Sequence, residues 1–176
     1  GAELRGLDLS QPVPSDVAKA VQEAWHEHLV VLIRGQDLSP TEYLSAARMF
    51  GTPQPGAART YYQKTGKENP DDGLGIPELM LLTNLDRNGN PALANESLGS
   101  GEVVWHSDNS YIDHPPAGSI LYAREIPPDG SGRTAFNNQY QAYEDLPDDL
   151  STAIDGRAAK HDATRNSAGV LRPGVE

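Results

Sequence analysis

The sequence has no cysteine, an excess of acidic over basic residues, and no long apolar run. With Cys 0 in 176 residues, disulfides, thiolate zinc sites and a cysteine nucleophile are excluded, so any metal must be bound by imidazole and carboxylate. The longest apolar stretches, 29–33 and 79–82, are far shorter than the roughly 20 residues that cross a bilayer. The net charge of −11 disfavours nucleic acid and membrane surfaces as partners.

The length of the chain suits a single domain, because chains of this size bury roughly two-thirds of the surface that unfolding exposes. We expect one domain over residues 1–176, incomplete at both ends, since the chain opens at Gly1 without Met and stops at Glu176 without a terminal element. No basic and then apolar leader is visible, so a soluble, cytoplasmic protein is expected. The sequence leaves a homo-oligomer open.

Helical and strand patterns open the chain. Ser15 is placed to cap a helix whose apolar positions recur every three or four residues. A short aliphatic run at 29–33, ended by a turn at Gly35, predicts a buried strand. Ser39-Pro40-Thr41-Glu42 is a capping box that predicts a second helix. The predicted apolar stripe of the first helix consists of Val17, Ala20, Val21, Ala24 and Trp25.

The rest of the chain has the pattern of short strands between breakers. Residues 54–77 are rich in Gly, Pro and polar residues, which predicts a long loop that could act as a lid. Short helical pieces are predicted at 143–146 and 148–154. Helices followed by many short strands favour an α+β protein built on a β-sandwich or barrel. The predicted strands are 79–83, 103–108, 119–123 and 134–137.

His106 and Asp108 form the strongest chemical signal in the sequence. On a strand, alternate side chains share a face, so these two would project together with their Cα atoms about 7 Å apart. Neutral imidazole with a hard carboxylate suits divalent iron, and two histidines with one carboxylate leave three open positions on the ion. The alternative is a surface pair, or an aspartate that fixes the histidine tautomer. Taken alone, His106-Ser107-Asp108 does not decide between a metal site and these alternatives.

The sequence around this pair resembles the taurine/2,4-D (TauD/TfdA-type) dioxygenase family. The resemblance is carried by Trp105-His106-Ser107-Asp108-Asn109-Ser110-Tyr111, by 115–123 and by 132–138, and at the front by 28–39 followed by Phe50-Gly51. It runs over nearly the whole chain and is weakest in the loop at 54–77. It implies a mainly β core, a double-stranded β-helix (jelly roll) flanked by helices.

The resemblance also implies an activity and a set of cofactors. Such an enzyme uses Fe(II), 2-oxoglutarate as cosubstrate and O₂ to hydroxylate a small, anionic organic substrate, with release of succinate and CO₂. His106 and Asp108 match the first two iron ligands. Thr134 matches the residue whose hydroxyl hydrogen-bonds a carboxylate of 2-oxoglutarate. The third ligand, a histidine, and the arginine that pairs with 2-oxoglutarate are expected beyond residue 176, and no catalytic residue is implied besides the metal ligands.

Substrate contacts are indicated less sharply. Tyr61 and Tyr62 fall near the region from which the family contacts its substrates, but they could equally pack the loop. Arg133 stands where family members commonly carry an acidic residue, and a solvated turn arginine is the simpler interpretation. Three further arginines could pair with an anionic substrate or lie on the surface. They are Arg59, Arg124 and Arg165.

Two other functions are compatible with the sequence. One is a non-catalytic jelly-roll binding domain that has lost the iron site. The other is a hydrolase that holds zinc with His106 and Asp108. The remaining histidines are predicted to be structural or solvent-facing rather than ligands. They are His26, His28, His114 and His161.

Overall fold

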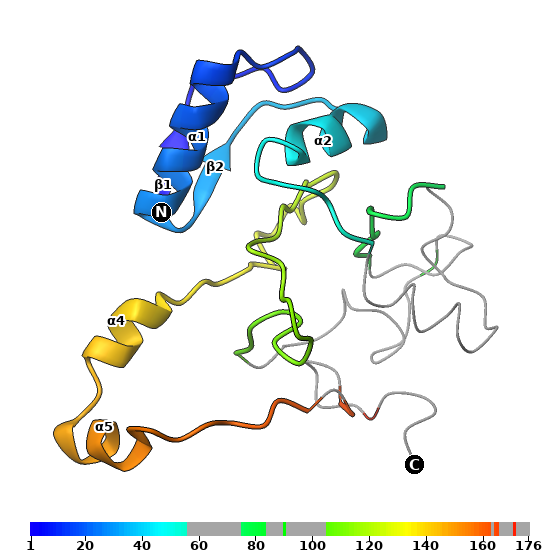
Figure 1. Ribbon diagram of the computed structural model, residues 1–176. Helices are drawn as coiled ribbons and strands as arrows, with labels where there is room; N and C mark the ends of the chain where they lie inside the picture. Colours follow the sequence, from blue (N-terminus) through cyan, green and yellow to red (C-terminus); the bar gives the residue numbers. More distant parts are fainter. Residues whose placement is uncertain (56–74, 84–89, 91–104, 163, 166–170, 172–176) are drawn as a thin grey trace. The chain divides into compact units, whose positions relative to one another are not determined.

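The computed structural model describes residues 1–55, 75–83, 90, 105–162, 164–165 and 171 (Figure 1). The chain divides into two compact units. The first unit comprises Gly1–Leu82 with Gly118–Tyr122, and the second comprises Thr83–Ala117 with Ala123–Glu176. Among the described residues, no helix combines the length and the hydropathy that a membrane crossing requires. The prediction of a single domain stays a prediction.

The first unit begins with a small β-α-β arrangement. Strand β1 (Ala2–Leu4) pairs in parallel with strand β2 (Val31–Ile33), with Glu3 opposite Leu32. Because parallel strands need a crossover connection, the intervening helix α1 (Ser15–His28) lies against both strands (Figure 1). The strand predicted at 29–33 is therefore confirmed in its last three residues, although Leu32 is 44% exposed instead of buried.

Helix α1 begins differently from the prediction. The expectation that Ser15 caps the helix is wrong: Pro14 is the N-cap, with φ −56° and ψ 146°, and Ser15 is the first helical residue. The Pro14 carbonyl accepts the first helical hydrogen bond from Ala18 N at 2.9 Å. The apolar stripe is largely confirmed, since Val21 is only 4% exposed, but Ala20 is exposed. The other stripe residues, Val17, Ala24 and Trp25, are half-buried.

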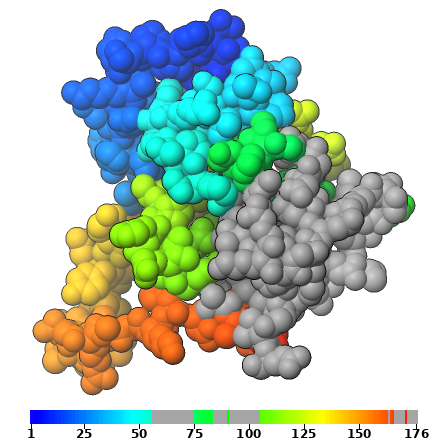
Figure 2. Space-filling model, turned by 45° about the vertical axis from the view of Figure 1, so that its right-hand side comes forward, coloured from blue at the N-terminus to red at the C-terminus, as the bar shows by residue number. Residues whose placement is uncertain are grey.

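Helix α2 (Pro40–Ala47) follows the predicted capping box. Ser39 Oγ accepts from the backbone N–H of Glu42 at 3.3 Å, and the Glu42 carboxylate accepts from Ser39 N at 2.7 Å and from Ser39 Oγ at 2.6 Å. Both donors keep the pKa of the Glu42 carboxyl below its usual value. Leu38 and Ala46 are buried beside this turn. Figure 2 shows α2 (cyan) next to the blue N-terminal segment.

Residues 118–122 complete the first unit through tyrosine contacts. The Tyr122 hydroxyl accepts from Leu38 N at 2.9 Å and donates to the Gln36 carbonyl at 3.3 Å. Tyr43 donates to the carbonyl of Ile120, and burial raises the pKa of its phenol. The rings of Tyr43 and Tyr122 lie 5.4 Å apart. This segment is thus attached to α2 and to the turn before it by side-chain hydrogen bonds.

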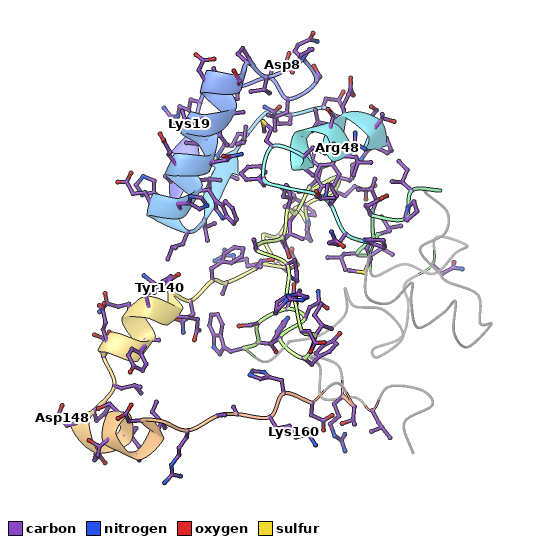
Figure 3. All side chains as sticks on the ribbon, in the orientation of Figure 1. Asp8, Lys19, Arg48, Tyr140, Asp148 and Lys160 are labelled. Atoms are coloured by element: carbon purple, nitrogen blue, oxygen red, sulfur yellow. The ribbon has the colours of Figure 1, made fainter. Side chains whose placement is uncertain are left out.

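Among its described residues, the second unit has the short helices α4 (Gln139–Glu144) and α5 (Asp148–Ile154). The α5 prediction is confirmed, whereas the piece predicted at 143–146 starts several residues too late. The reason is Asn138, whose Oδ1 accepts from two backbone N–H groups of the first turn. Tyr140 on α4 is 73% exposed (Figure 3), and no residue of this unit is buried among those that the structure describes.

The later strand predictions are wrong where the structure describes them. Residues 79–83, 105–108, 119–123 and 134–137 are not strands, and the described residues do not form a jelly roll. A strand is stable only when its backbone N–H and C=O groups pair with a neighbouring strand. In the described part of the chain such pairing occurs between β1 and β2, with an isolated bridge between Arg165 and Leu171.

Loss of the Ser39 cap should destabilise the first unit. We expect Ser39→Ala to lower the free energy of unfolding by about 1 kcal/mol, because the hydrogen bonds of the Ser39 hydroxyl with the backbone N–H and the carboxylate of Glu42 disappear. Thr41→Ala removes a hydroxyl from an exposed residue of the same turn and should have a clearly smaller effect. Urea denaturation of both variants provides the measurement, and equal losses would contradict the role of the cap.

The Glu42 carboxylate should contribute to stability only while it is ionised. Since its pKa is lower in the folded protein than in the unfolded chain, the contribution is complete at neutral pH and is lost as the pH falls through the folded pKa. The difference in free energy of unfolding between the wild type and Glu42→Gln should therefore shrink from neutral pH to about pH 3. Denaturation at both pH values checks this, and a difference independent of pH would contradict it.

Candidate metal centre

His106 and Asp108 bring an imidazole and a carboxylate together in the second unit. The distance from His106 Nε2 to Asp108 Oδ1 is 3.1 Å, and the side chains are 41% and 64% exposed. The sequence predicted that the two side chains would share one face of a strand, but the segment forms a bend followed by a turn. In that turn Asn109 has φ 54°, and its carbonyl accepts from Ile112 N at 3.1 Å. The side chains therefore converge although the backbone is not a strand.

The spacing of these two atoms fits adjacent ligands of one metal ion. In an octahedral site with metal–ligand bonds of about 2.1 Å, neighbouring donors lie about 3 Å apart. Imidazole with carboxylate is also the donor chemistry that non-haem Fe(II) takes. The same 3.1 Å suits a hydrogen bond from the histidine to the carboxylate. A metal and a proton thus compete for the lone pair of His106 Nε2.

The described residues supply two ligands and not a full set. Within them, no group of three His, Asp or Glu side chains is placed to hold a metal. His26 and His28 lie on the last turn of α1 in the first unit. His114 is exposed, and His161 Nδ1 lies 2.9 Å from Ser110 Oγ. The prediction that none of these four histidines completes the site stays a prediction.

Thr134 directly follows a turn that hydrogen bonds among residues 129–133 stabilise. Asp129 Oδ1 accepts from Ser131 N at 3.0 Å, and the hydrogen bonds from Ser131 lower the pKa of the Asp129 carboxyl. Arg133 Nε donates to the Gly130 carbonyl at 3.0 Å, so Arg133 is the exposed turn arginine that the sequence suggested. Thr134 is exposed, and its hydroxyl makes no hydrogen bond within the described part of the chain. Its predicted contact with 2-oxoglutarate is a proposal.

The other predicted binding residues divide into two groups. Tyr61, Tyr62 and Arg59, together with most of the predicted lid at 54–77, lie outside the described residues. Arg124 and Arg165 are described, and both are exposed, which agrees equally with a surface arginine and with one that contacts a substrate. Their role toward a substrate is untested.

Two features next to the pair were not predicted. Asn109 adopts the left-handed conformation that asparagine tolerates better than most residues, and this property was a usable signal. The hydrogen bond between Ser110 and His161 joins residues 51 positions apart. No pattern in a single sequence pairs two such residues.

Comparison with known proteins places these residues in a family context. The family model described as "Taurine catabolism dioxygenase TauD, TfdA family" matches residues 1–173. Pentalenolactone F synthase of Streptomyces avermitilis is 34% identical over 92% of this chain and 49% of its own length. The alpha-ketoglutarate-dependent 2,4-dichlorophenoxyacetate dioxygenase of Cupriavidus pinatubonensis is 30% identical over 91% and 54%.

A third relative extends the range of substrates named in the family. The alpha-ketoglutarate-dependent sulfate ester dioxygenase of Pseudomonas putida is 28% identical over 100% of this chain and 50% of its own length. The chain thus spans about half the length of the curated relatives it matches. No solved structure matches the chain significantly.

Proposed function

The chain belongs to the taurine catabolism dioxygenase TauD, TfdA family, and from that premise we propose that it provides two iron ligands of an Fe(II)- and 2-oxoglutarate-dependent dioxygenase. The enzyme hydroxylates a small, anionic organic substrate and releases succinate and CO₂. The core of the whole enzyme is a double-stranded β-helix, the fold of this family. The observation that supports the proposal best is the 3.1 Å approach of His106 Nε2 to Asp108 Oδ1 in a chain whose family match covers both residues.

Each residue has a definite part in this proposal. Bound Fe(II) supplies the oxidation chemistry: one oxygen atom of O₂ goes to the substrate and the other to the succinate formed from 2-oxoglutarate. His106 binds through its neutral Nε2, and Asp108 through an ionised oxygen. The hydroxyl of Thr134 donates a hydrogen bond to a carboxylate of 2-oxoglutarate. The protein need supply no general base, because the metal carries the oxidation chemistry and the fold supplies orientation.

The proposal of an anionic substrate is supported by two of the relatives. One is named for 2,4-dichlorophenoxyacetate and another for sulfate esters, and both compounds carry a negative charge beside an apolar part. Tyr61 and Tyr62 would face the apolar part, since phenol rings offer a flat apolar surface with a polar end. Arg124 or Arg165 would meet the charge, because guanidinium groups bind oxyanions through two parallel hydrogen bonds.

A binding domain without iron is the second candidate. The described residues hold two donors and no group of three, which is compatible with this candidate as well as with the first. A binding domain of this kind takes up no Fe(II), so it differs from the first candidate in a measurable quantity. The protein either takes up one equivalent of Fe(II) or it does not.

Substitution of His106 should separate these functions. We expect wild-type protein to bind one Fe(II) anaerobically and to release succinate from 2-oxoglutarate only when O₂ is supplied. His106→Ala should reduce both to background, because it removes one of the protein's metal donors. The variant should unfold at nearly the same urea concentration as the wild type, since His106 is 41% exposed.

His114→Ala is the matched control, because it removes an exposed imidazole of the same unit. It should retain wild-type iron binding and succinate release, measured with 2-oxoglutarate alone and with 2,4-dichlorophenoxyacetate or an alkyl sulfate added. Unchanged succinate release by His106→Ala would refute the assignment of the ligand. Turnover without O₂ that persists with zinc would favour a hydrolase.

A further inference from the structure

A hydrogen bond connects the segment that carries the metal ligands with a distant part of the second unit. His161 Nδ1 lies 2.9 Å from the hydroxyl of Ser110, which stands two positions after Asp108. Immediately after His161, the Asp162 carboxylate accepts from Thr164 N at 2.8 Å and from Thr164 Oγ1 at 2.9 Å. These two hydrogen bonds lie close to His161 in the sequence, so the segment that contacts Ser110 has side-chain hydrogen bonds of its own.

The segment that carries His106 and Asp108 contains no buried residue between positions 105 and 112. Both ligand side chains are substantially exposed, and the described residues 105–112 belong to no strand. Within the described part of the second unit no residue is buried. Ser110 is half-buried, and its side chain makes a long-range hydrogen bond two positions after Asp108.

We propose that His161 is a positioning residue for the iron site, acting through Ser110 on the segment that carries the two ligands. The inference rests on the proposed function. A segment that is already fixed loses less conformational freedom when the ion binds, so the ion binds more tightly. Removing the hydrogen bond therefore weakens Fe(II) binding, although neither His161 nor Ser110 is a ligand.

The identity of the side chain at 161 allows a specific test. Asparagine places an amide nitrogen or oxygen near the position of Nδ1 and can donate or accept as the imidazole does. Leucine occupies a similar volume and can do neither. His161→Leu should therefore remove the hydrogen bond with Ser110 and weaken Fe(II) binding. His161→Asn should keep both, whichever of the two side chains donates the hydrogen bond.

The experiment measures the dissociation constant for Fe(II) under anaerobic conditions, for protein shown by circular dichroism to be folded. His161→Leu and Ser110→Ala should each raise this constant by about tenfold, the lower end of the effect of residues that support metal ligands. The double variant should bind Fe(II) no more weakly than either single variant, because both substitutions remove the same hydrogen bond. His161→Asn should bind as the wild type does, and so should His114→Leu, the control on an exposed histidine.

The outcomes separate this inference from the proposed function. If the wild type takes up no Fe(II), both fail. If the wild type binds Fe(II) and folded His161→Leu binds it equally well, or if the effects of the two substitutions add in the double variant, only the role of His161 is refuted. Should His161→Leu fail to fold, Ser110→Ala alone decides, since it removes one oxygen atom and the same hydrogen bond.

Discussion

The proposed iron site depends on the approach of His106 Nε2 to Asp108 Oδ1 at 3.1 Å. Attraction between the two side chains cannot maintain that approach alone, because ion pairs at exposed positions contribute only about 0.2–1 kcal/mol. The turn at Asn109 shapes the backbone that carries both side chains, and the role proposed for the contact of Ser110 with His161 is to hold that backbone in place. A bound ion would replace the weak attraction with two coordinate bonds, and these would then reinforce the same geometry.

The helix ends could be predicted from the sequence where the hydrogen bonds that form them join residues close together in the chain. The capping box at 39–42 is satisfied by atoms within three residues of each other, so its prediction needs no knowledge of the rest of the fold. Ser15 failed as a cap for an equally local reason: the carbonyl of Pro14 already begins the helix. Asn138 could have been recognised as a cap by the same rule, and the first turn of α4 would then have been placed correctly.

The strands were not predictable in the same way, because the stability of a strand lies in its partner. Residues 119–123 have a suitable composition, yet Tyr122 and Ile120 are held by tyrosine hydroxyls and by the turn before α2 instead of by a ladder. The pairing of His106 with Asp108 was predicted from alternation along a strand, and the pair exists on a turn. Side chains two positions apart can approach each other in more than one backbone conformation. The contact of Ser110 with His161 depends on the tertiary fold, and sequence patterns carry no trace of it.

The division of the chain into units has a consequence for its synthesis. Tyr122 donates and accepts hydrogen bonds with residues around Leu38, which precedes it by 84 positions. At ribosomal rates of about 5–20 residues per second, Tyr122 is added to the growing chain roughly 4–17 s after Leu38. During that interval the hydrogen bonds that join Tyr122 to residues 36 and 38 cannot form, so the turn before α2 lacks part of the contacts that stabilise it in the complete unit.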